Sequence, residues 1–192
     1  MTGTTAGTER GHESARSVAV WDPLVRIVHW TVALAVLLNG FVTDPETDLH
    51  QWIGYAAMAA VATRLVWGLV GSGPARFAAF PPSPGRALAH LAALRRGSRD
   101  THLSHNPLGA LMVYNLWATL ALMGVSGYMM GMLRFFGMDW VKEMHELAFD
   151  WLMVSVALHL VGVVFDTRRT GVPLVRAMIT GRKRLPPGVR AE

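Results

Sequence analysis

The chain has 192 residues, 52% hydrophobic and 16% charged, with a mean hydropathy of +0.31 and a net charge of +5. Soluble domains are usually less apolar and more highly charged, and here the apolar residues are gathered in a few long runs, so the composition indicates an integral membrane protein. The absence of cysteine excludes disulfides, iron–sulfur ligation and thiolate chemistry.

Four apolar runs are long enough to cross a bilayer as helices. We expect the spans at residues 24–43, 50–70, 107–130 and 143–166. They make up one transmembrane domain of residues 20–167, and the predicted fold class is all-α, an integral membrane four-helix bundle. Residues 1–19 lack periodicity and any signal-peptide pattern, so they are predicted to be a disordered tail. Residues 168–192 are predicted to be a basic tail.

The connection between the second and third spans, residues 71–105, is rich in proline and arginine. Within it, residues 86–96 place Leu88, Leu91 and Leu94 near one side of a helix. This pattern predicts a short amphipathic helix that lies on the membrane surface rather than crossing the membrane.

Basic residues fix the expected orientation of the spans. Of the 18 Lys and Arg residues, only Arg134 and Lys142 fall in the two short turns on the side away from the termini. The positive-inside rule therefore predicts that both termini are cytoplasmic. The basic charge is then explained by topology and by anionic lipid, so we expect no nucleic-acid partner.

Four histidines lie in or beside the spans. His145 and His159 are fourteen residues apart in the fourth run, close to four helical turns, so they share one face at about 21 Å separation. With the expected topology, His29 lies at the depth of His159, near the cytoplasmic side, and His50 lies at the depth of His145, near the outer side. Each imidazole alone could be an interfacial hydrogen-bonding residue, but two matched pairs favour ligands at two levels.

Two histidines per level, without a carboxylate or thiolate at the same depth, are too few for zinc or a di-iron cluster. Axial ligation of haem needs only two ligands, because the porphyrin supplies four nitrogens. Arg64, fourteen residues after His50, is expected near the cytoplasmic side, where it could meet haem propionates, with Arg26 as a weaker candidate. The alternative for Arg64 is that its side chain reaches out to lipid phosphate.

Four segments of the sequence resemble the bacterial cytochrome b561 family, which includes the cytochrome b subunits of nickel–iron hydrogenases. They are VWDPLVRIVHW, HQWIGY with the later RLVWGLVG, HNPLGALMV, and KEMHELAFDWLMVSVALHLVGVVF, and the resemblance runs from about residue 18 to 184. It implies two haem b groups in the bacterial inner membrane, with quinone as substrate at one surface. The family's axial histidines correspond to His29, His50, His145 and His159. His105, in the HNPLGA motif, could help to bind a propionate or a quinone, or only cap a helix.

These features predict an electron-transfer membrane subunit between a periplasmic redox partner, a c-type cytochrome or a hydrogenase, and the quinone pool. Whether the chain is an enzyme by itself stays open. One alternative is a superoxide:quinone oxidoreductase of the same fold, in which Arg134 and Lys142 would attract the anion. A second is a haem-free proton or ion transporter that uses the membrane histidines, and a third is a purely structural anchor.

Overall fold

The protein is described by a computed structural model that covers residues 16–71, 73–98 and 100–185. The elements are β1 (Arg16–Ala19), α1 (Pro23–Phe41), α2 (Asp48–Val70), the 3-10 turns η1 (Gly73–Ala75) and η2 (Phe77–Ala79), α3 (Pro84–Arg95), α4 (Pro107–Met130), α5 (Asp139–Thr170), α6 (Leu174–Thr180) and β2 (Arg182–Leu185). Within this described part, α1, α2, α4 and α5 are the helices long and apolar enough to cross a membrane. The chain is therefore mostly helical, with four candidate spans.

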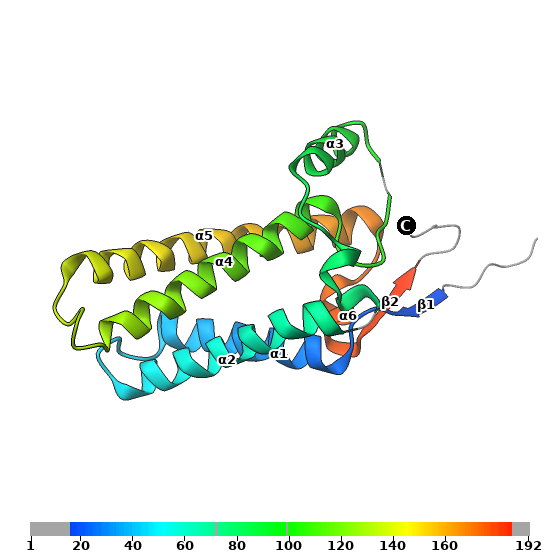
Figure 1. Ribbon diagram of the computed structural model, residues 1–192. Helices are drawn as coiled ribbons and strands as arrows, with labels where there is room; N and C mark the ends of the chain where they lie inside the picture. Colours follow the sequence, from blue (N-terminus) through cyan, green and yellow to red (C-terminus); the bar gives the residue numbers. More distant parts are fainter. Residues whose placement is uncertain (1–15, 72, 99, 186–192) are drawn as a thin grey trace, which may run out of the picture.

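The four long helices form two antiparallel pairs. α1 packs on α2, α4 packs on α5, and α2 packs on α4, whereas direct backbone packing between α1 and α5 is sparse. In Figure 1 the two pairs run side by side along the length of the molecule. This arrangement leaves side chains, rather than backbone, to fill the space between α1 and α5.

Most of the helical surface faces outward and is apolar. In each candidate span only 17% of the most apolar window is buried, and large side chains such as Leu34 and Val161 are more than half exposed. A continuous apolar surface of this size would cause association in water. A bundle with this surface belongs in a lipid environment, where these side chains contact acyl chains.

We call the end of the bundle that carries β1, α6 and β2 the terminal end, and the end with the turns at residues 42–47 and 131–138 the turn end. β1 and β2 pair in antiparallel fashion, with Val18 opposite Lys183 (Figure 1). The prediction of a disordered tail over residues 1–19 is therefore wrong for residues 16–19, while residues 1–15 lie outside the described part. Residues 168–185, in the segment predicted to be a basic tail, hold the end of α5, α6 and β2.

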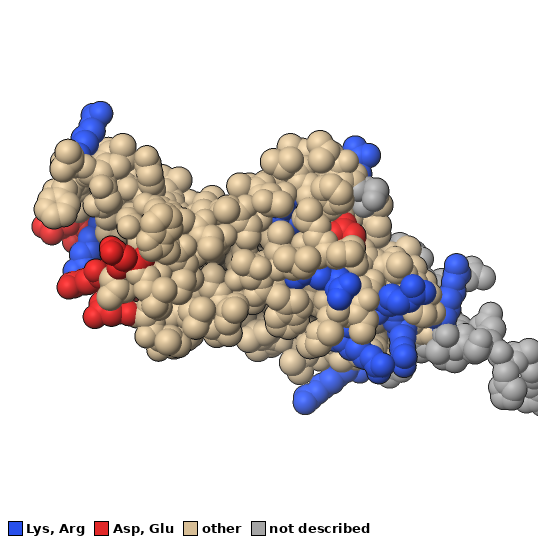
Figure 2. Space-filling view, turned by 90° about the horizontal axis from the view of Figure 1, so that it is seen from below, with Lys and Arg blue, Asp and Glu red and all other residues tan. Residues whose placement is uncertain are grey.

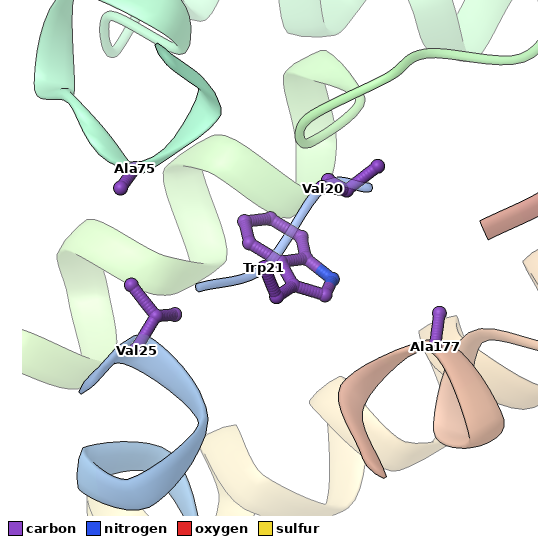
Figure 3. Packing of buried hydrophobic residues seen from close by; sticks show 5 residues of the cluster. All are labelled: Val20, Trp21, Val25, Ala75 and Ala177. Carbon is purple, nitrogen blue, oxygen red and sulfur yellow. The ribbon is translucent and has the colours of Figure 1, made fainter. Parts of the chain in front are cut away.

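A small hydrophobic core lies at the terminal end (Figure 3). Trp21 sits among Val20, Val25, Ala75 and Ala177, all of which are buried. These residues come from the chain before α1, from α1 itself, from η1 and from α6. Burial of these apolar side chains away from water stabilises the packing of these segments at the terminal end.

The connection between α2 and α4 contains the expected short helix. α3 begins after Ser83, whose hydroxyl accepts a hydrogen bond from the backbone nitrogen of Arg86. Leu88 is 68% exposed, while Ala87 and His90 on another side of α3 are buried. The exposed leucine agrees with the predicted amphipathic pattern, and contact of α3 with the membrane surface stays a prediction.

Candidate functional site

The α5 helix presents His145 and His159 on one face. Their separation of fourteen residues corresponds to about 21 Å along the helix axis. Ala148 and Leu152, which lie between them in the sequence and near the same face, are 4% and 2% exposed. The face that carries both imidazoles is therefore turned toward the interior of the bundle rather than toward lipid.

Each of these histidines has another histidine within electrostatic range. His159 interacts with His29 of α1, and His145 interacts with His50 of α2. Each of these two histidine pairs joins helices from opposite helix pairs in the bundle. The pair His29 and His159 lies toward the terminal end, and the pair His50 and His145 lies toward the turn end.

The turn-end histidines each meet a hydroxyl group. Nδ1 of His145 lies 2.9 Å from Oγ of Ser126 on α4, and Nδ1 of His50 lies 3.2 Å from Oγ1 of Thr43. Gly127, next to Ser126, allows close approach, because a Cβ added there would lie 3.3 Å from Cε1 of His145. These contacts could not be predicted from the sequence, since hydroxyl residues are common in membrane helices and nothing in their spacing marks a partner.

At the terminal end, His29 presents a different situation. Its Nδ1 is buried and has no hydrogen-bond partner among the residues that the structure describes. Its ring stands edge-on to Trp30, with 5.2 Å between the ring centroids. A buried polar atom without a partner is uncommon in folded proteins.

Arg64 is buried at the same end, with 5% of its surface exposed. Its Nη2 donates a 2.9 Å hydrogen bond to the carbonyl of Ala75, and its guanidinium lies 5.7 Å and 5.1 Å from the ring centres of Phe77 and Trp117. Nη1 is buried without a partner in the described residues. A buried guanidinium does not reach lipid phosphate, so the alternative that Arg64 extends to the membrane surface is not supported. Arg26, the weaker candidate, donates through Nη2 to the carbonyl of Ile179.

His105 lies just before α4, between the rings of Trp21 and Phe80, at centroid distances of 4.9 Å and 4.6 Å. Burial, together with the nearby cations Lys183 and Arg64, lowers the pKa of His105 from 6.5 to about 3, so the imidazole is neutral near pH 7.

The helix cap of α4 is supplied by Asn106, whose side chain accepts a 2.7 Å hydrogen bond from the nitrogen of Gly109. Capping therefore does not explain His105.

A pocket of about 510 Å³ opens beside His105. Its wall includes the polar residues Arg86, His102 and Ser104 and the ring of Phe80. A pocket with a mostly apolar wall and a few polar groups is typical of a site for a small organic molecule.

The donor set suits a planar macrocycle better than a bare ion. Within the described ranges, no group of three or more His, Asp or Glu side chains could hold a metal ion by itself. Two facing imidazoles are instead sufficient for the axial positions of a haem, whose porphyrin supplies the other four nitrogens. The paired histidines therefore fit a haem, and the unpartnered Nη1 of Arg64 fits its anionic propionates.

Comparison with known proteins agrees with this chemistry. The family model described as prokaryotic cytochrome b561 matches residues 20–181. Neither the curated proteins nor the solved structures gave a match. Because the matched residues cover most of the chain, from the start of the bundle to the end of α6, this protein belongs to the prokaryotic cytochrome b561 family, membrane proteins of electron transport that bind haem b.

Proposed function

We propose that the chain is a di-haem b-type cytochrome that transfers electrons across the bacterial inner membrane between a periplasmic redox partner and the quinone pool. The observation that carries this proposal is a pair of histidines within electrostatic range of each other at each of two levels, with one helix, α5, contributing to both. His29 and His159 would hold one haem b, and His50 and His145 the other. When bound, the two haems would supply reversible one-electron chemistry.

The histidines determine what kind of redox site this is. Two imidazoles would hold each haem without leaving the iron open to oxygen, and such a site would suit electron transfer. Levels about 21 Å apart on α5 cover about two-thirds of the apolar thickness of a bilayer. Sites at these two levels would bring redox groups within reach of both surfaces.

Quinone is the proposed substrate at the terminal end. The pocket beside His105 has a volume of about 510 Å³ and opens next to the loop before α4. Neutral His105 can donate or accept a hydrogen bond at a quinone oxygen, and Phe80 offers an aromatic face. His105 also lies within electrostatic range of His29 and His159, so a quinone there would be close to one histidine pair.

Charge distribution supports the proposed orientation, with both termini in the cytoplasm. Figure 2 shows Lys and Arg side chains gathered over the terminal end, and Asp and Glu side chains mostly at the turn end. Cytoplasmic segments of inner-membrane proteins carry the excess of basic residues. The turn end would then face the periplasm.

The turn end is the proposed docking side for the protein partner. Its exposed acidic residues are Asp44, Glu46, Asp48, Asp139, Glu143 and Glu146. Lys142 is paired with Glu146 at 3.7 Å, which leaves Arg134 as the unpaired basic side chain described at this end. Excess negative charge repels superoxide and attracts a basic protein, so it favours a basic c-type cytochrome over the superoxide alternative.

A reduced-minus-oxidised spectrum with a haem count tests the proposal. We expect a b-type spectrum and two haems per chain, and we expect His50→Ala and His159→Ala each to lose a different haem. A colourless protein would support the transporter alternative instead. Loss of the same haem in both variants would overturn the pairing of the histidines.

A further inference from the structure

The two turn-end histidines share a feature that the terminal-end pair lacks: each Nδ1 contacts a hydroxyl oxygen on a neighbouring segment. A hydroxyl has a single hydrogen to donate, so the direction of each contact can be worked out from its other partners. The direction of each hydrogen bond decides which imidazole nitrogen carries the proton and which is unprotonated.

The hydrogen bonds around His50 are compatible with only one direction for its contact with Thr43. The side-chain nitrogen of Asn39, Nδ2, donates a 2.9 Å hydrogen bond to the backbone carbonyl of His50. The other side-chain atom of Asn39, Oδ1, is therefore an acceptor. Oγ1 of Thr43 lies 3.2 Å from Oδ1 of Asn39 and donates its single hydroxyl hydrogen to that oxygen. The hydroxyl oxygen must therefore accept from Nδ1–H of His50, which leaves Nε2 of His50 without a proton.

At His145 the same logic applies through Ser126, which is 0% exposed. Oγ of Ser126 lies 2.8 Å from the carbonyl of Leu122 and 3.1 Å from that of Met123. Carbonyls only accept, so they take the hydroxyl hydrogen, and Oγ accepts from Nδ1–H of His145 at 2.9 Å. Nε2 of His145 is then also unprotonated.

We propose that Ser126 and Thr43 are positioning residues that fix the tautomer and ring orientation of His145 and His50, so that both present an unprotonated Nε2 for axial ligation at the turn end. This inference rests on the proposed function. A hydrogen bond accepted from the far ring nitrogen raises the basicity of a histidine ligand and orients its ring. Greater basicity stabilises the oxidised metal, so these two hydroxyls lower the midpoint potential of the turn-end haem.

The terminal-end pair has no comparable support in the described residues. Among the residues that the structure describes, Nδ1 of His29 is buried without a hydrogen-bond partner, and no hydrogen bond is found for the ring of His159. The hydroxyl contacts are therefore made to the turn-end histidines. A change confined to the turn-end haem would distinguish their role from a general loss of stability.

The test uses the complete haem-loaded protein in detergent and the variant Ser126→Ala. We expect the midpoint potential of the haem that His145→Ala removes to become more positive, and its affinity for haem to fall by about 10- to 100-fold, the usual cost of removing such a partner. The other haem should keep its potential. Ser155→Ala is the matched control, because Ser155 is 1% exposed and binds Asn115 rather than a histidine.

The second hydroxyl provides an independent test should Ser126→Ala fail to fold. Thr43→Val keeps the shape and removes the hydroxyl, while Thr43→Ser keeps the hydroxyl. We expect Val to raise the potential of the turn-end haem and Ser to restore it. If both hydroxyl deletions leave that haem unchanged, or shift both haems equally, the positioning role is disproved. If His145→Ala retains two haems, the proposed function itself fails, which is a distinct result.

Discussion

The indole nitrogen of Trp67 donates a 2.8 Å hydrogen bond to Oδ2 of Asp22, which joins the end of α2 to the start of α1. The other carboxylate oxygen, Oδ1, accepts a 2.8 Å hydrogen bond from the nitrogen of Val25 and caps α1. One side chain therefore begins the first span and fixes the end of the second. This link holds Arg64, on the last turns of α2, in place relative to His29 on the first turns of α1.

Asp22→Ala is expected to remove both interactions. A helix cap and a partly buried hydrogen bond contribute about 1 kcal/mol each, so the free energy of unfolding should fall by about 2 kcal/mol. Trp67→Phe removes only the indole bond and should cost about half as much. Denaturation in detergent, followed by circular dichroism, measures both. Equal losses would mean that the cap contributes nothing.

Arg64→Leu should lower the midpoint potential of the terminal-end haem. A buried positive charge favours the reduced, more negative form of a neighbouring group, and removing it removes that stabilisation. Arg64→Lys keeps the charge but loses the planar contacts with Phe77 and Trp117, so it should restore part of the potential. Potentiometric titration separates the haems. A shift confined to the turn-end haem would contradict the placement of Arg64.

His105→Ala is expected to slow quinone reduction at least tenfold while both haems are retained, because it removes a proposed hydrogen-bond partner of the substrate without touching a proposed ligand. Phe80→Leu should raise the apparent KM, since it keeps an apolar side chain but loses the aromatic face. Steady-state reduction of a soluble quinone analogue, with a haem count for each variant, measures this. Arg95→Gln, on the exposed end of α3, is the control.

Gly68→Ala should destabilise the terminal end. A Cβ at this position would lie 2.2 Å from the ring of Phe77, which also packs 5.2 Å from Trp117 and cannot easily move. Overpacking of this kind costs about 1–3 kcal/mol. Gly162→Ala, in α5, is the matched control, because no described atom lies within 4 Å of its added Cβ and alanine is a better helix former. Thermal unfolding of the two variants should therefore change in opposite directions.

Lys183 provides a prediction on pH. It is 3% exposed and its ammonium donates to the carbonyls of His102, Leu103 and Ser104 at 2.9, 2.7 and 2.9 Å. Desolvation lowers the pKa of Lys183 from 10.5 to about 8, so between these values the unfolded chain binds more protons than the folded protein. Stability contributed by this group therefore rises with pH across that window, by about 3 kcal/mol in full.

The comparison variant is Lys183→Met, which cannot titrate. Melting temperatures of both proteins are measured in detergent at pH 7.5 and pH 10. The melting temperature of the wild type should rise relative to that of the variant between these two pH values. Parallel curves would show that the folded pKa of Lys183 is close to its ordinary value.

The histidine pattern was accessible from sequence because it depends on local helix geometry. Fourteen residues on a helix place two side chains on one face whatever surrounds them, so His145 and His159 could be related without a structure. Their electrostatic partners, His29 and His50, followed from the topology of four spans. The four segments that resemble the family were likewise sufficient to indicate it, and the family match confirms that assignment.

The strand pair β1–β2 was missed for an equally physical reason. Each strand has only four residues, and Val18 lies opposite Lys183, far away in the sequence. Short strands carry too little alternation to be recognised, and pairing over such a distance is decided by the surrounding fold. The order of this region comes from contacts such as that of Lys183 with the loop before α4.

Sequence alone determined that the chain is a membrane bundle and which end is basic, and it predicted which histidines share a level, because hydropathy and helical period are properties of consecutive residues. Only the tertiary structure decided which hydroxyl meets which imidazole, since Ser126 reaches His145 from another helix. It also decided that Arg64 turns inward against Phe77 and Trp117. Side-chain direction depends on what packs against a helix, and that information is not contained in any single span.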